Sequence, residues 1–102
     1  MFPKPKTERD KAYRHWVASL ECVVCRSNLP CAAHHVPEKG KGSKGAKVSD
    51  YRCLPLCHPS VGREGHHMEY HRVGRETFAR THDLDLEVLI MAYNRVYERR
   101  EE

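Results

Sequence analysis

The chain has 102 residues, of which 39% are apolar and 31% are charged, and its formal net charge is +4 at pH 7. This length allows one domain with a small core, which predicts that a metal ion or a disulfide stabilises the fold. The absence of any apolar run of roughly 20 residues excludes a membrane-spanning helix, while five cysteines and a polar first segment argue for a cytoplasmic protein over a secreted disulfide scaffold.

The first twenty residues predict a basic tail followed by an amphipathic helix. Residues 1–6 contain two prolines, which disfavour regular hydrogen bonding. Thr7 is a candidate cap for a helix that runs from Glu8 to about Leu20. Four residues form its apolar face at helical spacing: Tyr13, Trp16, Val17 and Leu20.

Two strands with a lysine-rich loop between them are predicted next. CAAHHV (31–36) has strand character, and VSDYRCLPL (48–56) is expected to pair with it antiparallel. The intervening PEKGKGSKGAK carries three glycines and four lysines, which is typical of an exposed loop. This loop is either a solvated linker or a phosphate-binding surface. In the second case the contacts come from Lys39, Lys41, Lys44, Lys47 and Arg52.

The remainder of the chain predicts a loop and a set of helices. HPSVGREG (58–65) is a small loop, and HHMEYHRV (66–73) is a short helix that ends near Gly74. RETFARTH (75–82) continues as further helical turns. Asp83 or Asp85 caps the last helix, whose apolar stripe is expected to pack across the first helix. The stripe consists of Leu86, Leu89, Ile90, Tyr93 and Tyr97.

The cysteines indicate a structural zinc site. Cysteines that stay reduced beside eight histidines point to metal. Cys22 and Cys25 form a Cys-x-x-Cys knuckle, and Cys57 supplies a third thiolate for a tetrahedral ion. The fourth ligand is open among Cys31, Cys53, His58 and His66. Cys53 is the weakest candidate, because four residues of strand separate it from Cys57 by about 13 Å.

The histidines form a second candidate metal set. His34 and His35 are neighbours on a predicted strand and therefore point to opposite faces, so that one can ligate while the other acts as a base. His67 and His71 are four residues apart on a predicted helix and reach one ion from the same face. Three neutral imidazoles with open coordination positions are typical of a catalytic site that polarises phosphate oxygens.

The order of these motifs resembles the HNH, or ββα-metal, nuclease superfamily, and in particular its small bacterial and phage members of the recombination-enhancement type. The matching strings are CVVCRSNLPCAAHHV, GAKVSDYRCLPLC and HHMEYHRVG, which together cover residues 22–74. The resemblance implies an α+β fold with a zinc-stabilised ββα core. It predicts a single domain over residues 1–102, divided into a tail and helix (1–20), the core (21–74) and carboxy-terminal helices (75–102).

The resemblance also implies roles for individual residues. His35 matches the general base, and Asp50 stands where the family has a middle Asn that orients the loop of the base. His34, His67 and His71 match the ligands of the catalytic ion. In zinc-bearing members a second cysteine pair lies at the start of the helix, where this chain has Cys57 and, in place of the fourth cysteine, His66. The inserted HPSVGREG departs from that pattern, so Cys31 stays the alternative fourth ligand.

The function implied is a metal-dependent endodeoxyribonuclease that hydrolyses DNA phosphodiester bonds with a structural Zn²⁺ and one catalytic divalent ion, which is Mg²⁺, Mn²⁺, Zn²⁺ or Ni²⁺. DNA is the expected partner, and a recombinase or another phage or bacterial DNA-processing protein is a candidate second one. The alternative is a non-catalytic zinc module that binds nucleic acid as a recombination accessory, for which His35 has no use. A purely structural zinc domain would need neither the histidine pairs nor the lysine loop.

Overall fold

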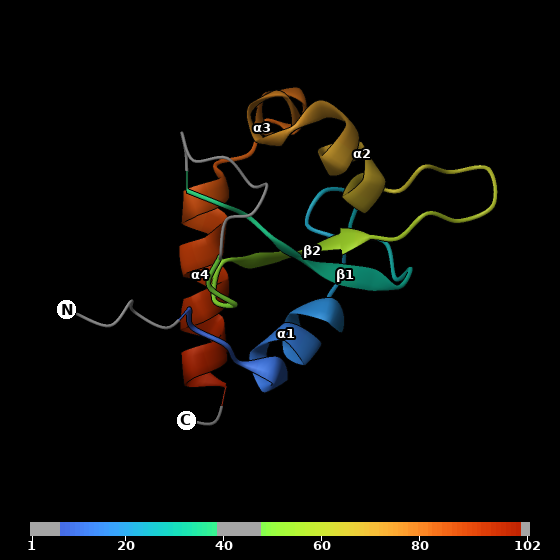
Figure 1. Ribbon diagram of the computed structural model, residues 1–102. Helices are drawn as coiled ribbons and strands as arrows, with labels where there is room; N and C mark the ends of the chain where they lie inside the picture. The colour runs from blue at the N-terminus through green and yellow to red at the C-terminus, as the bar shows by residue number, and fades with distance from the viewer. Residues whose placement is uncertain (1–6, 39–47, 101–102) are drawn as a thin grey trace.

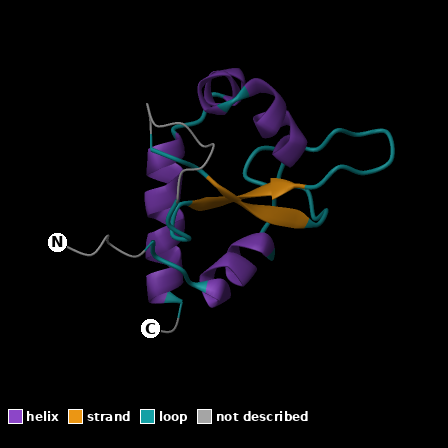
Figure 2. Cartoon of the chain, viewed as in Figure 1, coloured by secondary structure: helices purple, strands orange, loops and turns teal. Residues whose placement is uncertain are grey.

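The computed structural model describes residues 7–38 and 48–100 and shows an α+β fold (Figures 1 and 2). Its six elements are α1 (Lys11–Ala18), β1 (Cys31–His35), β2 (Cys53–Cys57), α2 (His66–Val73), α3 (Arg75–His82) and α4 (Leu86–Arg99). The α+β class predicted from the sequence is confirmed, and each predicted helix and strand of the described residues is present. The bounds of α2 and α3 are those predicted, while α1, β1 and β2 have shifted ends.

The two strands form an antiparallel sheet with helices on both faces. The register pairs Cys31 with Cys57 at one end and His35 with Cys53 at the other. Since neighbouring residues of a strand point to opposite faces, Cys53 packs toward α1 while Leu54 packs toward α2 and α3. Figure 1 shows α1 below the sheet, α2 and α3 above it, and α4 along its end.

The larger core cluster lies between the sheet, α2, α3 and the first half of α4. Its rings include Tyr70 and Phe78, whose centroids are 5.2 Å apart. The buried members are Val36, Leu54, Leu56, Tyr70, Phe78, Leu86 and Ile90. Burial of these side chains is the main apolar contribution to folding, at about 1.5–3 kcal/mol for each large side chain.

The second half of α4 packs on α1 through aromatic rings. Tyr97 meets Tyr13 edge-on at 4.9 Å between centroids, and both Tyr93 and Tyr97 contact Trp16. The Asn94 amide donates to the Tyr13 hydroxyl oxygen at 2.8 Å. The predicted packing of the last helix across the first is therefore confirmed for its second half, whereas its first half belongs to the larger cluster.

The predicted start of the first helix is wrong by three residues. Asp10, not Thr7, caps α1, and its carboxylate accepts a hydrogen bond from the Tyr13 amide at 2.9 Å. The preceding residues cannot be helical because they pair with a distant segment. The Asp10 amide donates to the Asp50 carboxylate at 2.7 Å, and the Asp50 amide donates to the Glu8 carbonyl at 3.0 Å. The last helix is capped by Asp85.

The second strand is shorter than predicted because its first residues form a turn. The Arg52 amide donates to the Ser49 carbonyl at 3.0 Å, and pairing with β1 begins at Cys53. The predicted strand 48–56 therefore splits into a turn that holds Asp50 and a strand that ends at Cys57.

Removal of the Phe78 ring should lower the free energy of unfolding by about 3–5 kcal/mol, because Phe78→Ala leaves a cavity in the larger core. Phe78 is 1% exposed. Val61, which is fully exposed, is the control, and Val61→Ala should change the free energy by less than about 0.5 kcal/mol. Denaturant titration followed by circular dichroism measures both values. Equal values for the two variants would contradict the assigned core.

Candidate functional site

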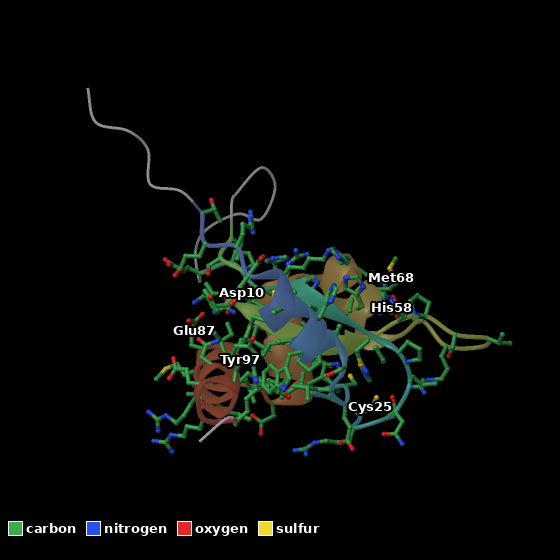
Figure 3. All side chains as sticks on the ribbon, turned by 90° about the horizontal axis from the view of Figure 1, so that it is seen from below. Asp10, Cys25, His58, Met68, Glu87 and Tyr97 are labelled. Atoms are coloured by element: carbon green, nitrogen blue, oxygen red, sulfur yellow. The ribbon has the colours of Figure 1, made fainter. Side chains whose placement is uncertain are left out.

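Three cysteines and one histidine come together beside the end of β2. Cys22 and Cys25 lie in a knuckle after α1, in which the Arg26 amide donates to the Cys22 carbonyl at 2.9 Å. Cys22 is buried, whereas Cys25, which is labelled in Figure 3, is exposed. The knuckle is tied to the sheet by the Val23 amide, which donates to the Pro55 carbonyl at 3.0 Å.

The spacing of the ligand atoms matches a tetrahedral ion. Sγ of Cys22, Cys25 and Cys57 and a ring nitrogen of His66 all lie within 4.8 Å of one another. Nδ1 of His66 is 3.4 Å from Cys22 Sγ and 3.3 Å from Cys57 Sγ. Ordinary Zn–S and Zn–N bonds in a tetrahedron place sulfur and nitrogen about 3.6 Å apart. These four residues could therefore hold a metal ion.

The inserted loop does not displace His66. Residues 58–65 project from the molecule (Figure 1) as a loop that Ser60 and Arg63 close with two backbone hydrogen bonds of 3.1 and 2.9 Å. At its end Gly65 adopts φ +81°, and a Cβ there would lie 2.7–2.8 Å from backbone atoms of Cys57 and His58. Glycine thus permits the close return that places the His66 amide 3.3 Å from Cys57 Sγ.

The other three candidates for the fourth ligand are not members of this group. Cys31 packs against Cys22 and Cys57, but its thiol donates to the Leu29 carbonyl at 3.4 Å. Burial raises the pKa of Cys31 to about 11 and that of Cys53 to about 12. Cys53 packs against α1, and His58 is exposed. Of the four candidates, only His66 has a ligand atom within 4.8 Å of all three sulfur atoms.

Glu69 and His82, which the sequence analysis did not identify, lie on the side of His66 that faces away from the thiolates. Glu69 Oε1 is 4.0 Å from His66 Nε2, and both carboxylate oxygens of Glu69 lie 2.9–3.0 Å from His82 Nε2. One ring nitrogen of His66 thus faces the thiolates and the other faces a carboxylate. At 4.0 Å the contact between Glu69 and His66 is too long for a hydrogen bond and is electrostatic, and the hydrogen-bond partner of Glu69 is His82. The His-x-x-Glu spacing on one helix face was the available sequence signal.

The second candidate group consists of His34 from β1 and His67 and His71 from α2. Their ligand nitrogens lie within 4.8 Å of one another, and Nε2 of His67 and Nε2 of His71 are 3.2 Å apart. Two imidazoles on one ion have nitrogens about 2.9–3.4 Å apart. Nε2 of His34 is buried and has no hydrogen-bond partner among the described residues. An unpartnered buried nitrogen beside two other imidazoles fits a metal ion.

The protonation state of this group suits metal binding. Burial, with the neighbouring His67 and His71, lowers the pKa of His34 to about 3. Burial also lowers the pKa of His67, with a smaller contribution from His71. His34 is therefore neutral at pH 7, and the neutral imidazole is the form that ligates.

His35 points to the opposite face of β1 from His34 and contacts Asp50. Nε2 of His35 lies 2.8 Å from Asp50 Oδ1. Because an ionised carboxylate only accepts hydrogen bonds, Nε2 carries the hydrogen and the neutral ring keeps a lone pair on Nδ1. The side chain of His35 is 37% exposed. This arrangement leaves an oriented, accessible base.

Asp50 is held ionised by residues of the amino-terminal segment. Its side chain is 1% exposed and lies 3.0 Å from both the Arg9 and the Arg14 guanidinium. Burial alone would raise its pKa, but hydrogen bonds from His35, the Asp10 amide and Arg9 lower the pKa to about 2. Sequence analysis missed both arginines, because they lie 41 and 36 residues from Asp50 along the chain.

One open pocket is lined both by the three potential metal ligands and by His35, and we call it the histidine pocket. Its lining includes Arg9, His34, His35, His67, His71 and Arg75. Both guanidinium groups are ion-paired within the chain, that of Arg9 with Asp50 and that of Arg75 with Glu76 and Glu87. Three potential metal ligands, a candidate base and two paired arginines thus line one pocket.

The predicted phosphate contacts divide into two groups. Lys39, Lys41, Lys44 and Lys47 lie outside the described residues. Arg52 is 19% exposed, and its guanidinium donates to Glu87 and to the Val36 carbonyl. These contacts join β2 to α4, so Arg52 serves the fold and we do not assign it to phosphate contact.

Fold and site together define a small α+β protein whose described residues contain one four-residue and two three-residue groups of potential metal ligands, the last of which consists of His66, Glu69 and His82 and shares His66 with the cysteines. The chain belongs to the DUF968 family, described as a protein of unknown function, whose family model matches residues 1–99. No curated protein and no solved structure matches the chain. Across residues 7–38 and 48–100, no helix combines the length and the apolar character needed to cross a membrane.

Asp50→Asn should lower the free energy of unfolding by about 2 kcal/mol at pH 7, because it removes a carboxylate whose pKa is depressed from 3.8 to about 2. A depressed pKa stabilises the fold above pH 4, and this contribution is lost as the pH falls from about 4 to 2. The variant should therefore lack that part of the acid dependence. Denaturant titrations at pH 7, 4 and 3 measure it.

The matched control is Asp83→Asn. Asp83 is exposed and has φ +53°, a conformation that asparagine adopts readily. This substitution should leave both the stability and its acid dependence nearly unchanged. An equal loss of unfolding free energy in both variants would contradict a special role for Asp50.

Proposed function

We propose that this protein is a metal-dependent HNH-type endonuclease that hydrolyses DNA phosphodiester bonds. The observation that carries the proposal is the convergence of His34, His67 and His71 on one point beside the His35–Asp50 pair. A binding module needs no oriented, unligated imidazole next to a potential metal site. The arrangement of β1, β2 and α2 is consistent with a ββα-metal core.

In this proposal the two ligand groups have different tasks. Cys22, Cys25, Cys57 and His66 hold a structural zinc ion, since four protein ligands close the coordination sphere. His34, His67 and His71 supply only three ligands and leave positions for substrate. A divalent ion at this second group would polarise the phosphate and stabilise the leaving oxygen.

The protein residues perform the proton transfer. His35 Nδ1 accepts the proton of the attacking water, and the charge that develops on the ring is stabilised by Asp50. Arg9 and Arg14 keep Asp50 ionised, which keeps the ring oriented with Nδ1 free. In this proposal Arg9 and Arg75, which line the histidine pocket, contact the phosphate backbone while they stay paired with Asp50 and Glu87.

The proposed zinc site predicts about one tightly bound zinc per chain, and loss of the ion should unfold so small a domain. Cys25→Ser and His66→Ala should each lose zinc and helicity, whereas Cys31→Ala should retain zinc because Cys31 lies outside the group. Metal analysis and thermal melting by circular dichroism measure these outcomes. Zinc retained by His66→Ala but lost from Cys31→Ala would make Cys31 the fourth ligand.

The proposed base predicts that His35→Ala lowers the rate of supercoiled plasmid nicking by about 10²- to 10⁴-fold while zinc content stays unchanged. The assay uses purified protein that is stripped of loosely bound metal and then supplied with Mg²⁺, Mn²⁺, Zn²⁺ or Ni²⁺ in turn. The control is His15→Ala, because His15 is an exposed histidine on α1, and its rate should equal that of the wild type.

Two results would overturn the nuclease proposal. Equal nicking by the wild type and His35→Ala would remove His35 as the base. Absence of metal-dependent cleavage by a zinc-loaded, folded wild type that still binds DNA would favour the accessory zinc module.

A further inference from the structure

The buried side-chain atoms that lack a hydrogen-bond partner gather at the histidine pocket. Among the described residues there are four such atoms, which are Nε2 of His34, the hydroxyl oxygen of Tyr70, and Nε and Nη1 of Arg75. All three residues line the pocket. A buried polar atom without a partner destabilises a fold and calls for an explanation. The candidate metal group accounts for His34, and the atoms of Tyr70 and Arg75 remain.

Tyr70 packs on His34 and lies near Arg75. The ring centroids of Tyr70 and His34 are 4.1 Å apart, and Tyr70 is only 7% exposed. Burial raises the pKa of Tyr70, and the charge of Arg75 opposes this rise, so the hydroxyl and the guanidinium are close enough to interact. A guanidinium nitrogen only donates hydrogen bonds, and a hydroxyl has one proton to donate. This pair of groups therefore requires an acceptor from outside the chain.

The pairing of Arg75 with the chain leaves part of its guanidinium unused. Nη2 donates to Glu87 at 3.1 Å, whereas Nε is 3.6 Å from the Glu76 carboxylate, which is too long for a hydrogen bond. Arg52 already donates to both carboxylate oxygens of Glu87. Arg75 can therefore donate from Nη1 to a ligand while Nη2 stays with Glu87.

The start of α3 adds backbone donors at the same end of the pocket. The first amides of a helix have no acceptor within the helix, and Gly74, the residue before α3, provides no side-chain cap for them. Gly74 also lines the histidine pocket. A Cβ built on Gly74 would meet no described atom within 4 Å outside its chain neighbours, so the space beside the helix start is open. Helix starts of this kind bind phosphate.

We propose that Tyr70, Arg75 and the start of α3 form a second phosphate subsite, which holds a phosphodiester of the nucleic-acid backbone next to the one at the candidate metal group. A guanidinium, a hydroxyl and backbone amides together match the several acceptor oxygens of a phosphate. Two subsites in one pocket would hold a strand at two points and so orient its scissile bond. The inference rests on the proposed function for nucleic acid as the ligand, whereas phosphate binding itself requires no catalysis.

The test is an NMR titration of the full chain with inorganic phosphate at constant ionic strength and without added divalent metal. Side chains cover the unpaired atoms, so binding requires a local rearrangement, and the amides of residues 74–76 should shift with a Kd of about 1 mM. Tyr70→Phe removes only the hydroxyl and should weaken binding by about tenfold or more. The control is Tyr93→Phe, which changes a tyrosine outside the pocket and should bind like the wild type.

Thermal melting separates a binding role of the Tyr70 hydroxyl from a structural one. Because an unpaired buried hydroxyl destabilises the fold, Tyr70→Phe should melt at the temperature of the wild type or above it when phosphate is absent. Added phosphate should raise the melting temperature of the wild type more than that of Tyr70→Phe. A lower melting temperature of Tyr70→Phe without phosphate would assign the hydroxyl to the fold and overturn the subsite.

A duplex DNA without terminal phosphates identifies the source of the phosphate. It should displace inorganic phosphate from residues 74–76, because the backbone phosphodiester and the free ion use the same donors. Failure of this displacement would restrict the subsite to free or terminal phosphate and overturn the proposal.

The subsite and the nuclease proposal can fail separately. The subsite is overturned if residues 74–76 of the wild type do not shift by about 10 mM phosphate, or if Tyr70→Phe binds phosphate as tightly as the wild type. Neither result bears on plasmid nicking. Conversely, phosphate and DNA binding at this place in a protein that never nicks plasmid would retain the subsite and reject the nuclease.

Discussion

The register of β1 against β2 is the constraint on which the candidate site depends. Pairing of His34 with Leu54 turns His34 toward α2, and pairing of His35 with Cys53 turns His35 toward Asp50. Because side chains alternate across a strand, a slip of one residue would exchange the two histidines. The same register ends with Cys57 opposite Cys31, which brings the third thiolate to the knuckle. The positions of both ligand groups therefore depend on the backbone pairing of β1 with β2.

The start of α2 couples the two groups. His66 and His67 are neighbours, and consecutive residues of a helix diverge by about 100°. His66 consequently faces the thiolates while His67 faces His34 and His71. An ion held by the cysteines and His66 would fix both the position and the rotation of α2. In this way one group of potential ligands can set the geometry of the other, since His66 and His67 are joined by a single peptide bond.

The arginines of the described residues pair with buried or partly buried carboxylates. Asp50 is surrounded by Arg9, Arg14 and His35, and its negative charge is enclosed. Elsewhere, Glu87 pairs with both Arg52 and Arg75 and joins α4 to the start of β2 and to the start of α3. Arginine thus has two uses in this part of the chain, one in joining elements and one in keeping the carboxylate beside His35 ionised.

The sequence by itself determined the local features. Helical spacing predicted α1 and α4, local residue composition predicted both strands and the two short helices, and the knuckle and histidine spacings predicted which ligands could share an ion. These features depend on residues within a few positions of one another, so a local pattern reveals them. The exact start of α1 was beyond such a pattern, because it depends on hydrogen bonds between Asp10 and Asp50. The turn before β2, in which the Arg52 amide donates to the Ser49 carbonyl, is local, and strand character alone did not reveal it.

Only the tertiary structure decided which distant residues meet. The choice of His66 over Cys31 depends on the path of the loop after Cys57 and on Gly65, which no ligand spacing encodes. The arginines around Asp50 and the engagement of Arg52 with Glu87 are likewise contacts between segments 35 to 41 residues apart in the chain. Long-range packing and electrostatics select such partners, and a one-dimensional pattern of residues carries no information about distance in space.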